Sequence, residues 1–311
     1  RLGIEHITYE DTSYAFLQCP PNMPDVSAAL NVVKQIRSFN PKFVLSLGGS
    51  SPVADLCAGF TTVATIPFDG TFPVAATQIL VVPRTLSAQD RNLAARLHFD
   101  EQTLYSNQYA FAFQAPAPPL KRAALAIPKD AVAFCLVGST GDPELSPGFL
   151  KMLNEACRQE PRLFFVFIGE FTLADPQFAS FSDLQDRSCF LGTRADTSAI
   201  LGACDAYLNP PRQGGASSAV AAMAAGLPVL SQGWGDVVDQ ACPTDFYERW
   251  TNATQIASFA KQLLIDPGLI KQISIRSRKR AAECTDRRNM LNKLIAHMED
   301  GQLDRQAVFG A

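Results

Sequence analysis

Several classes of protein are excluded by what this sequence lacks. Its eight cysteines are scattered without a CxxC pair, and only three histidines, His6, His98 and His297, occur among 311 residues. That spacing gives neither a disulfide framework nor a cluster of metal ligands, so we expect no metal site. Cysteines within apolar runs, such as Cys135, pack as small hydrophobic residues and indicate a reducing compartment.

Long apolar runs and a positive net charge are missing as well. No stretch reaches the roughly 18 apolar residues of a membrane span, and no secretory signal opens the chain. The net charge is −3, so the chain lacks the excess of basic residues that is typical of nucleic-acid-binding proteins. These observations predict a cytoplasmic protein without a nucleic-acid partner. Because the chain starts at Arg1 in the middle of an element, we expect that part of its N-terminus is missing.

Short apolar runs alternate with segments of helical periodicity, a pattern typical of βαβ units and a parallel sheet. The first part is predicted to hold strands at 43–47, 62–66 and 79–82, and a helix from Ser87, its N-cap, to Leu97. The second part is more regular. Its strands are expected at 132–137, 163–168, 188–191, 206–208 and 228–230. Its helices are expected at 146–159, 196–203, 215–226, 236–242, 253–265, 268–283 and 287–299.

A proline-rich stretch at 113–119 is the best candidate for a boundary, because proline lacks an amide donor and stiffens the chain. The predicted fold class is α/β, with two Rossmann-like, doubly wound domains facing across a cleft. The expected divisions are an N-terminal domain over 1–115, a linker over 116–130, a second domain over 131–300 and a tail over 301–311.

Small, polar and glycine residues follow every predicted strand of the second domain. Ligands of an open parallel sheet bind beyond the carboxyl ends of its strands, so these residues are candidates for binding. A single glycine-rich turn is weak support, since glycine also serves ordinary turns. Apart from the segment Asn209–Ser218, the candidate donor-binding residues are Gly138, Ser139, Thr140, Gly169, Thr193 and Asp236.

The segment from Asn209 to Ser218 is the most informative one. Gly214 and Gly215 allow a ligand to approach the backbone, and Ser217 and Ser218 lie on the first turn of an alanine-rich helix. The amides and the dipole at such a helix start bind anions. With the guanidinium of Arg212, the segment predicts a cradle for a diphosphate. The simpler interpretation is a glycine-rich turn with a serine cap.

At this point the sequence resembles a family. The runs Asp205–Pro210, Gly214-Gly215 and Ala222–Leu230, together with Phe190–Thr193, are similar to the donor-binding half of GT-B glycosyltransferases. The similarity extends over 131–300 and is only general over 1–115. It implies transfer of a sugar from a nucleotide diphosphate sugar, by default a UDP-sugar, to a hydroxyl of a glycan, lipid-linked or protein acceptor. The nucleotide sugar is a co-substrate, so no cofactor is expected.

One departure from the family concerns two glutamates of the donor site. Many members carry one immediately before the "AMA" triplet and a second eight residues earlier, and these positions are Ala221 and Gln213 here. Either the chain belongs to a divergent, inverting branch, or donor binding has been lost. The alternatives to a transferase are a non-catalytic GT-B-like partner subunit and a nucleotide-sugar epimerase.

An inverting transfer needs a general base for the acceptor hydroxyl, while helix-start amides and Arg212 stabilise the leaving diphosphate without a metal. The base should come from the first domain, where the candidates are His6, Glu5 and Asp69. On the acceptor side, Gly48, Gly49 and Ser50 follow a strand and form either a ligand site or an ordinary βα turn.

Two further features leave alternatives open. Asp236 accepts hydrogen bonds from sugar hydroxyls or caps the next helix, and Trp234 stacks on a ring or anchors the surface. The basic cluster of Arg276, Arg278, Lys279 and Arg280 is either a solvated helix face or a contact with an anionic membrane. The second interpretation would suit a lipid-linked acceptor and place the protein at the inner face of the membrane.

Overall fold

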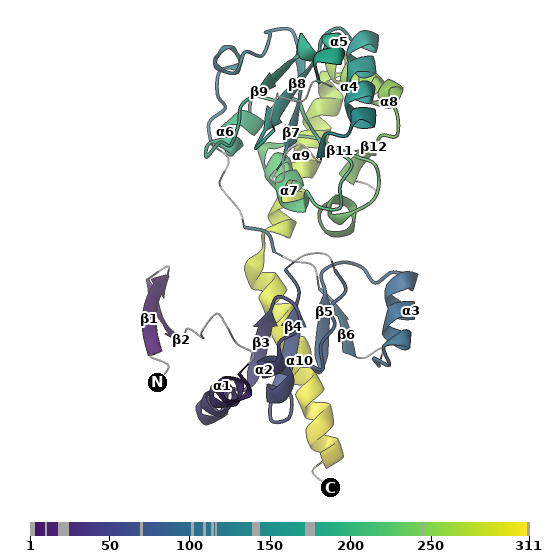
Figure 1. The fold of residues 1–311 in the computed structure, drawn as a ribbon. Coiled ribbons are helices and arrows are strands. Elements are labelled where there is room, and N and C mark those ends of the chain that lie inside the picture. The colour runs from purple at the N-terminus through teal and green to yellow at the C-terminus, as the bar shows by residue number, and fades with distance from the viewer. Residues whose placement is uncertain are drawn as a thin grey trace. The chain divides into compact units, whose positions relative to one another are not determined.

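A computed structural model describes most of the chain. The described residues are 4–9, 11–17, 25–68, 71–100, 103–107, 110–112, 115, 117–138, 144–171, 178–243 and 246–309. They form two compact units (Figure 1). Unit 1 comprises Arg1–Val82, Ser87–Tyr105 and Ala296–Ala311, and unit 2 comprises Pro83–Leu86 and Ser106–Ile295.

Unit 2 is built on a six-stranded sheet in which every neighbouring pair is parallel. Its strands are β7 (Val132–Val137), β8 (Leu163–Ile168), β9 (Ser188–Phe190), β10 (Ala206–Leu208), β11 (Val229–Ser231) and β12 (Tyr247–Arg249). They lie in the order β12-β11-β10-β7-β8-β9, which is the 3-2-1-4-5-6 order of a Rossmann fold. The order therefore reverses between β7 and β10, and that is where such folds bind ligands.

Helices cover both faces of this sheet (Figure 1). One layer holds α4 (Pro147–Gln159), α5 (Ser182–Gln185) and α8 (Ala253–Ile265). The other holds α6 (Thr197–Leu201), α7 (Ala216–Ala225), α9 (Pro267–Cys284) and the π-helix η5 (Val237–Ala241). Side chains of β7 alternate between the layers, Phe134 facing one and Cys135 the other, as the pleat requires.

Unit 1 has a smaller sheet of four strands in the order β3-β4-β5-β6. These are β3 (Phe43–Leu47), β4 (Thr62–Ile66), β5 (Ile79–Val82) and β6 (Leu104–Ser106), and β3–β4 and β4–β5 pair in parallel. Its helices are α1 (Val26–Phe39), α2 (Pro52–Cys57) and α3 (Ala88–Arg96), and the predicted Ser87 caps α3 in a capping box. A hairpin of β1 (Ile4–Tyr9) and β2 (Thr12–Leu17) precedes them.

The predicted α/β class with two parallel-sheet domains is confirmed, and each predicted strand is present within one residue of its expected bounds. The elements that were not predicted include the β1–β2 hairpin, α1, α5, β6 and β12. In β6 and β12, with three residues each, and in α5, with four, apolar periodicity is too brief to be recognised. The last helix, α10 (Arg287–Phe309), runs beyond the expected end at 299 and brings residues 296–311 into unit 1.

Residues 117–130, within the expected linker 116–130, belong to unit 2 in the structure. It contains the short 3₁₀ helix η2 (Arg122–Leu125), and Leu125 and Ile127 are buried in the core of unit 2. Arg122 makes a double hydrogen bond of 2.7 Å with the carboxylate of Asp205, just before β10. The boundary between the two units lies at 105–106 instead. The segment belongs to unit 2 because Arg122 forms its ion pair there and the apolar side chains of the segment pack into that core.

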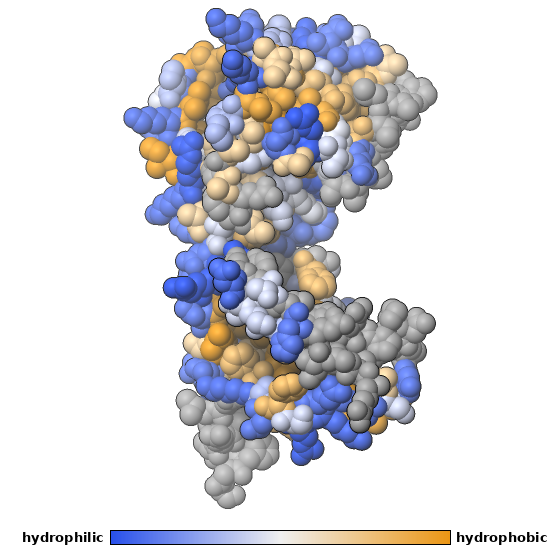
Figure 2. Space-filling model, turned by 90° about the vertical axis from the view of Figure 1, so that its left-hand side faces the viewer, coloured by the Kyte–Doolittle hydropathy of each residue, from blue (hydrophilic) through white to orange (hydrophobic). Residues whose placement is uncertain are grey.

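In the part of the chain that the structure describes, no helix is long and apolar enough to cross a bilayer. The visible surface mixes hydrophilic residues with hydrophobic patches (Figure 2). The described cysteines are all free thiols, and all but Cys189 are buried, which fits the packing role expected of them.

Candidate functional site

The carboxyl ends of β7 and β8 are packed backbone against backbone. Gly169 has a φ of 129°, and a Cβ atom there would lie 2.0 Å from the carbonyl oxygen of Gly138. A Cβ atom on Gly138 would in turn lie 2.2 Å from the ring of Phe171. Both positions therefore require glycine for packing alone. Their role in donor binding stays a prediction, and Ser139 and Thr140 lie outside the described residues.

Arg212 lies at the reversal point between β7 and β10 and is fully engaged with protein atoms. Its Nη1 donates to both carboxylate oxygens of Glu144, each at 2.7 Å. Its Nη2 donates to the carbonyl of Val137 at 2.7 Å and to the hydroxyl of Tyr207 at 3.0 Å. Its Nε donates to Oδ1 of Asn209 at 3.1 Å. All three nitrogens of the guanidinium thus bridge the ends of the two strands.

This Arg212 network is shielded from water. The side chains of Arg212 and Glu144 are 10% and 7% exposed. Burial also raises the pKa of Tyr207 to about 12, against the opposing charge of Arg212. A phosphate oxygen would have to displace one of these acceptors to reach the guanidinium. These contacts hold the ends of β7 and β10 and the loops that follow them together, and a direct contact of Arg212 with a diphosphate stays a prediction.

The turn that follows, from Gln213 to Ser218, is only partly open to solvent, because Gly214 and Gly215 are half-buried and Ala216 is buried. Gly215 has a φ of 111°, and a Cβ atom there would lie 2.2 Å from Oδ1 of Asn209, so this glycine is required. Gly214 has open space around its Cα, with no atom within 4 Å of an added Cβ. Gln213 and Ser217 are exposed, whereas Ser218 reaches the hydroxyl of Tyr207.

The start of α7 has no side-chain cap. Its N-cap is Gly215, and the first bond within the helix runs from the amide of Ala219 to the carbonyl of Gly215. The serine-cap interpretation is therefore wrong. The amides of Ala216, Ser217 and Ser218 precede that bond, as at every helix start, and are available to an anion. The geometry supports the predicted anion site at this turn, with its ligand still to be tested.

The loop after β11 packs against the same turn. Gly235 has a φ of 80°, and a Cβ atom there would lie 2.7 Å from the carbonyl oxygen of Gln213. The amide of Asp236 donates to that carbonyl at 2.7 Å, and Nε2 of Gln213 donates to Oδ1 of Asp236 at 3.1 Å. Asp236 does not cap η5 with its side chain. The loop thus holds the carboxylate of Asp236 against Gln213, and the same loop carries the exposed Trp234.

Beyond β9, Gly192 and Thr193 are exposed. Arg194 and Asp196 form an exposed ion pair there, with two contacts of 2.7 Å. On the opposite side of β7 from β9, Ser231 at the end of β11 is buried and accepts a hydrogen bond from the amide of Gly233. The carboxyl ends of β7 to β11 therefore surround one region, as predicted for a doubly wound sheet.

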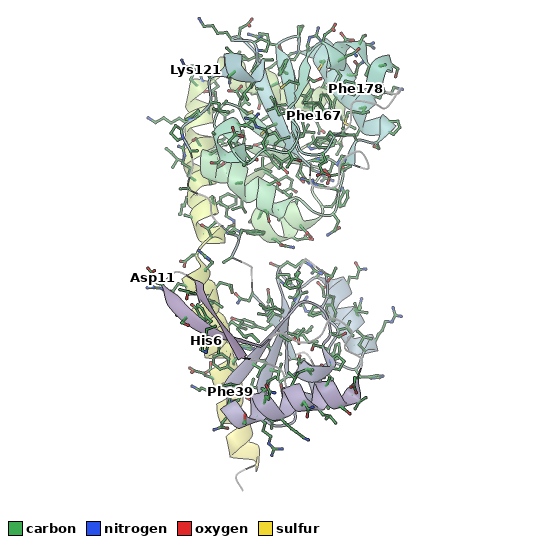
Figure 3. All side chains as sticks on the ribbon, turned by 60° about the vertical axis from the view of Figure 1, so that its left-hand side comes forward. His6, Asp11, Phe39, Lys121, Phe167 and Phe178 are labelled. Atoms are coloured by element: carbon green, nitrogen blue, oxygen red, sulfur yellow. The ribbon has the colours of Figure 1, made fainter. Side chains whose placement is uncertain are left out.

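Unit 1 holds the predicted acceptor-side residues. Gly48 follows β3 with a φ of 109°, and the ring of Phe68 lies 3.1 Å from where its Cβ would be. Gly49 and Ser50 are exposed. His6 lies exposed on β1 (Figure 3), whereas the side chain of Glu5 and the whole of Asp69 lie outside the described residues. These candidates for the general base stay predictions.

The basic cluster of α9 is largely engaged in holding unit 2 together. Arg278 donates to the carbonyl of Ala225 at the end of α7, and Arg280 donates to the carbonyl of Ala241 at the end of η5. Arg276 and Arg280 also lie over the ring of Phe246. These contacts favour the helix-face interpretation, and membrane contact stays a prediction. Within the described ranges, no three His, Cys, Asp or Glu residues are grouped to hold a metal.

Sequence analysis missed Glu144 and Tyr207. Glu144 follows β7 and Arg212 follows β10, so opposite charges come after the two strands at which a doubly wound sheet reverses. That pattern was visible in the sequence. The pairing itself was not, because it depends on β10 lying beside β7.

No protein-family model and no curated protein matches this chain. Solved structures do match. A glycosyltransferase from Rickettsia africae aligns with a TM-score of 0.68 and 14% identity, covering 91% of this chain and 84% of that one. Anabaena HepE in complex with UDP aligns with a TM-score of 0.64 and 14% identity, covering 88% and 82%. The pneumococcal O-GlcNAc transferase GtfA, in complex with UDP and GlcNAc, aligns with a TM-score of 0.56 and 12% identity, covering 95% and 62%. At these identities the likeness concerns the fold, and the chain has the two-domain α/β fold of GT-B glycosyltransferases.

Proposed function

We propose that this protein is a glycosyltransferase that moves a sugar from a nucleotide diphosphate sugar, by default a UDP-sugar, to an acceptor hydroxyl. The observation that carries this proposal is the uncapped start of α7, which follows the half-buried turn at Gly214 where the strand order reverses. It is supported by the fold, and by matched structures that hold UDP or UDP-glucose (HepE) or UDP and GlcNAc (GtfA). The acceptor is a glycan, a lipid-linked sugar or a protein.

The chemistry follows from the charge that develops on the leaving diphosphate. The amides of Ala216 to Ser218 and the exposed hydroxyl of Ser217 would stabilise this charge, without a metal in our proposal. Arg212 would contribute by holding the turn in place. The general base for an inverting transfer would come from unit 1, where His6, Glu5 and Asp69 remain the candidates.

The test uses two glycines with similar surroundings. An alanine at Gly214 or at Gly148 in α4 would meet no atom within 4 Å, so neither change should disturb the fold. Gly214→Ala places a methyl group where a phosphate must approach, and should weaken binding of the true nucleotide sugar by about tenfold or more, an energy of about 1.4 kcal/mol. Gly148→Ala should leave it unchanged.

Binding of UDP-, GDP- and CMP-sugars to both variants and to the wild-type protein is measured by titration calorimetry and thermal shift. A bound donor should raise Tm by mass action. Equal affinity of Gly214→Ala and the wild-type protein for the donor would place the diphosphate elsewhere. Absence of binding for every nucleotide sugar would refute the donor site.

A second candidate, a non-catalytic GT-B-like partner subunit, is favoured by one observation. Ala221 is exposed on α7 and offers no polar group where the resemblance implies a carboxylate. Turnover separates the two: release of UDP from a UDP-sugar that depends on a hydroxyl acceptor shows an enzyme. Nucleotide-independent association with another protein would support the partner subunit.

A further inference from the structure

The two tryptophans of the chain lie in opposite environments. Trp250 is fully buried and stacks on Phe149, with ring centroids 5.5 Å apart. Trp234 is 45% exposed, although it lies in a short loop between two buried elements. A single exposed aromatic residue is unremarkable in itself. What needs an explanation is how firmly this one is held.

The loop fixes the position of Trp234 in three ways. Gly233 and Gly235 on either side have φ values of 89° and 80°, a left-handed conformation that turns the backbone sharply at both ends of the residue. Nε1 of Trp234 donates to Oε1 of Gln232 at 3.1 Å, which orients the indole and satisfies its polar atom. The two hydrogen bonds between Asp236 and Gln213 hold the loop to the turn before α7.

Polar groups for a sugar come from the same loop as Trp234 and from the turn to which this loop is bonded. Nε2 of Gln213 and Oδ1 of Asp236 are 3.1 Å apart, and both residues adjoin the open space at Gly214. A pyranose ring presents hydroxyl groups at its edge and C–H bonds on its faces. Carboxylates and amides bind the edge through hydrogen bonds, and the electron-rich face of an indole attracts the C–H bonds. A loop that carries an oriented indole and a carboxylate, bonded to a turn that carries an amide, therefore suits a pyranose.

We propose that Trp234 is the stacking surface for the sugar ring of the nucleotide sugar and that it determines which sugars are accepted. This inference rests on the proposed function, because it places the sugar one loop away from the diphosphate at the α7 start. The nucleoside diphosphate part of the donor does not touch Trp234. Removing the indole therefore weakens binding of the sugar-bearing donor and leaves the free nucleotide unaffected.

The experiment compares wild-type protein with Trp234→Ala and Trp234→Phe. Titration calorimetry gives Kd for UDP-glucose, UDP-GlcNAc and GDP-mannose, and for free UDP and GDP. Trp234→Ala should raise Kd for the preferred nucleotide sugar by about threefold to tenfold, the range of one aromatic stacking contact. Trp234→Phe should recover part of this loss, and Kd for the free nucleotide should stay the same.

Fluorescence gives a second readout that a structural role would not produce. Trp234 is the exposed one of two tryptophans, so the nucleotide sugar should change the emission of the wild-type protein more than the free nucleotide does. In Trp234→Phe only Trp250 remains, and this difference should vanish. Ile265→Ala is the control, because Ile265 is 77% exposed at the end of α8, outside the strand-end loops.

The outcomes separate the two proposals. If the wild-type protein binds a nucleotide sugar and Trp234→Ala binds it equally well, the stacking role is refuted and the transferase proposal stands. An equal loss for the free nucleotide would also refute stacking, since it would show a disturbed loop. If no nucleotide or nucleotide sugar of the set binds the wild-type protein, the donor site and the inference both fall.

Discussion

Replacing Glu144 by glutamine tests whether the buried Arg212 network organises the site. The carboxylate of Glu144 accepts two contacts of 2.7 Å from Nη1 of Arg212, and both side chains are at least 90% shielded from water. Glutamine keeps one acceptor oxygen but turns an N–H₂ group toward the guanidinium. It therefore leaves the positive charge of Arg212 buried without compensation.

The expected loss of stability is large because the buried positive charge of Arg212 cannot be hydrated. Removing one member of a buried ion pair costs about 3–5 kcal/mol. For a domain of about 150–250 residues each kcal/mol lowers Tm by roughly 2–4 °C, so Glu144→Gln should lower Tm of unit 2 by roughly 6–20 °C. The same change releases the turn at Gly214 from its support, so affinity for the nucleotide sugar should fall as well.

Tryptophan fluorescence during urea or thermal unfolding is the assay, because both tryptophans lie in unit 2 and Trp250 is fully buried. Asp196→Asn is the matched control. Its pair with Arg194 also has two contacts of 2.7 Å, but the side chains are 42% and 38% exposed, and exposed pairs contribute little. If Glu144→Gln has the same Tm as the wild-type protein, the network does not stabilise unit 2. If Tm falls equally in both variants, burial does not explain the effect of the network on stability.

Two predictions concern groups whose pKa is shifted by burial. Desolvation raises the pKa of Cys157 and Cys242 to about 12 and that of Cys189 to about 11, so these thiols should resist alkylation at neutral pH until urea unfolds unit 2. Mass spectrometry of iodoacetamide-labelled peptides checks this, and equal labelling with and without urea would contradict it. His297 stacks on Tyr105 with ring centroids 4.0 Å apart, and desolvation lowers its pKa from 6.5, so the unfolded chain takes up the proton first. The contribution of His297 to the stability of unit 1 should therefore be fully present above about pH 6.5 and be lost as the pH falls below that value. His297→Phe should remove this dependence in thermal melts.

Much of the fold followed from local pattern. The strands from β7 to β11 are apolar runs bounded by glycine and polar residues, and the alternation with helical periods predicted their parallel pairing. The turn at Gly214-Gly215 before an alanine-rich helix was predicted in the same way. Such features depend on residues within one element or one loop, so the sequence by itself determined them.

The partners of the charged side chains were decided only by the tertiary structure. Arg212 was expected to face a diphosphate, and its pairing with Glu144, 68 residues earlier, arises because β10 lies beside β7. Likewise, Gln213 contacts Asp236 because β11 lies beside β10. Hydrophobic periodicity fixes which residues are buried, whereas a buried charge takes the partner that strand order supplies, and nothing local in the chain specifies that order.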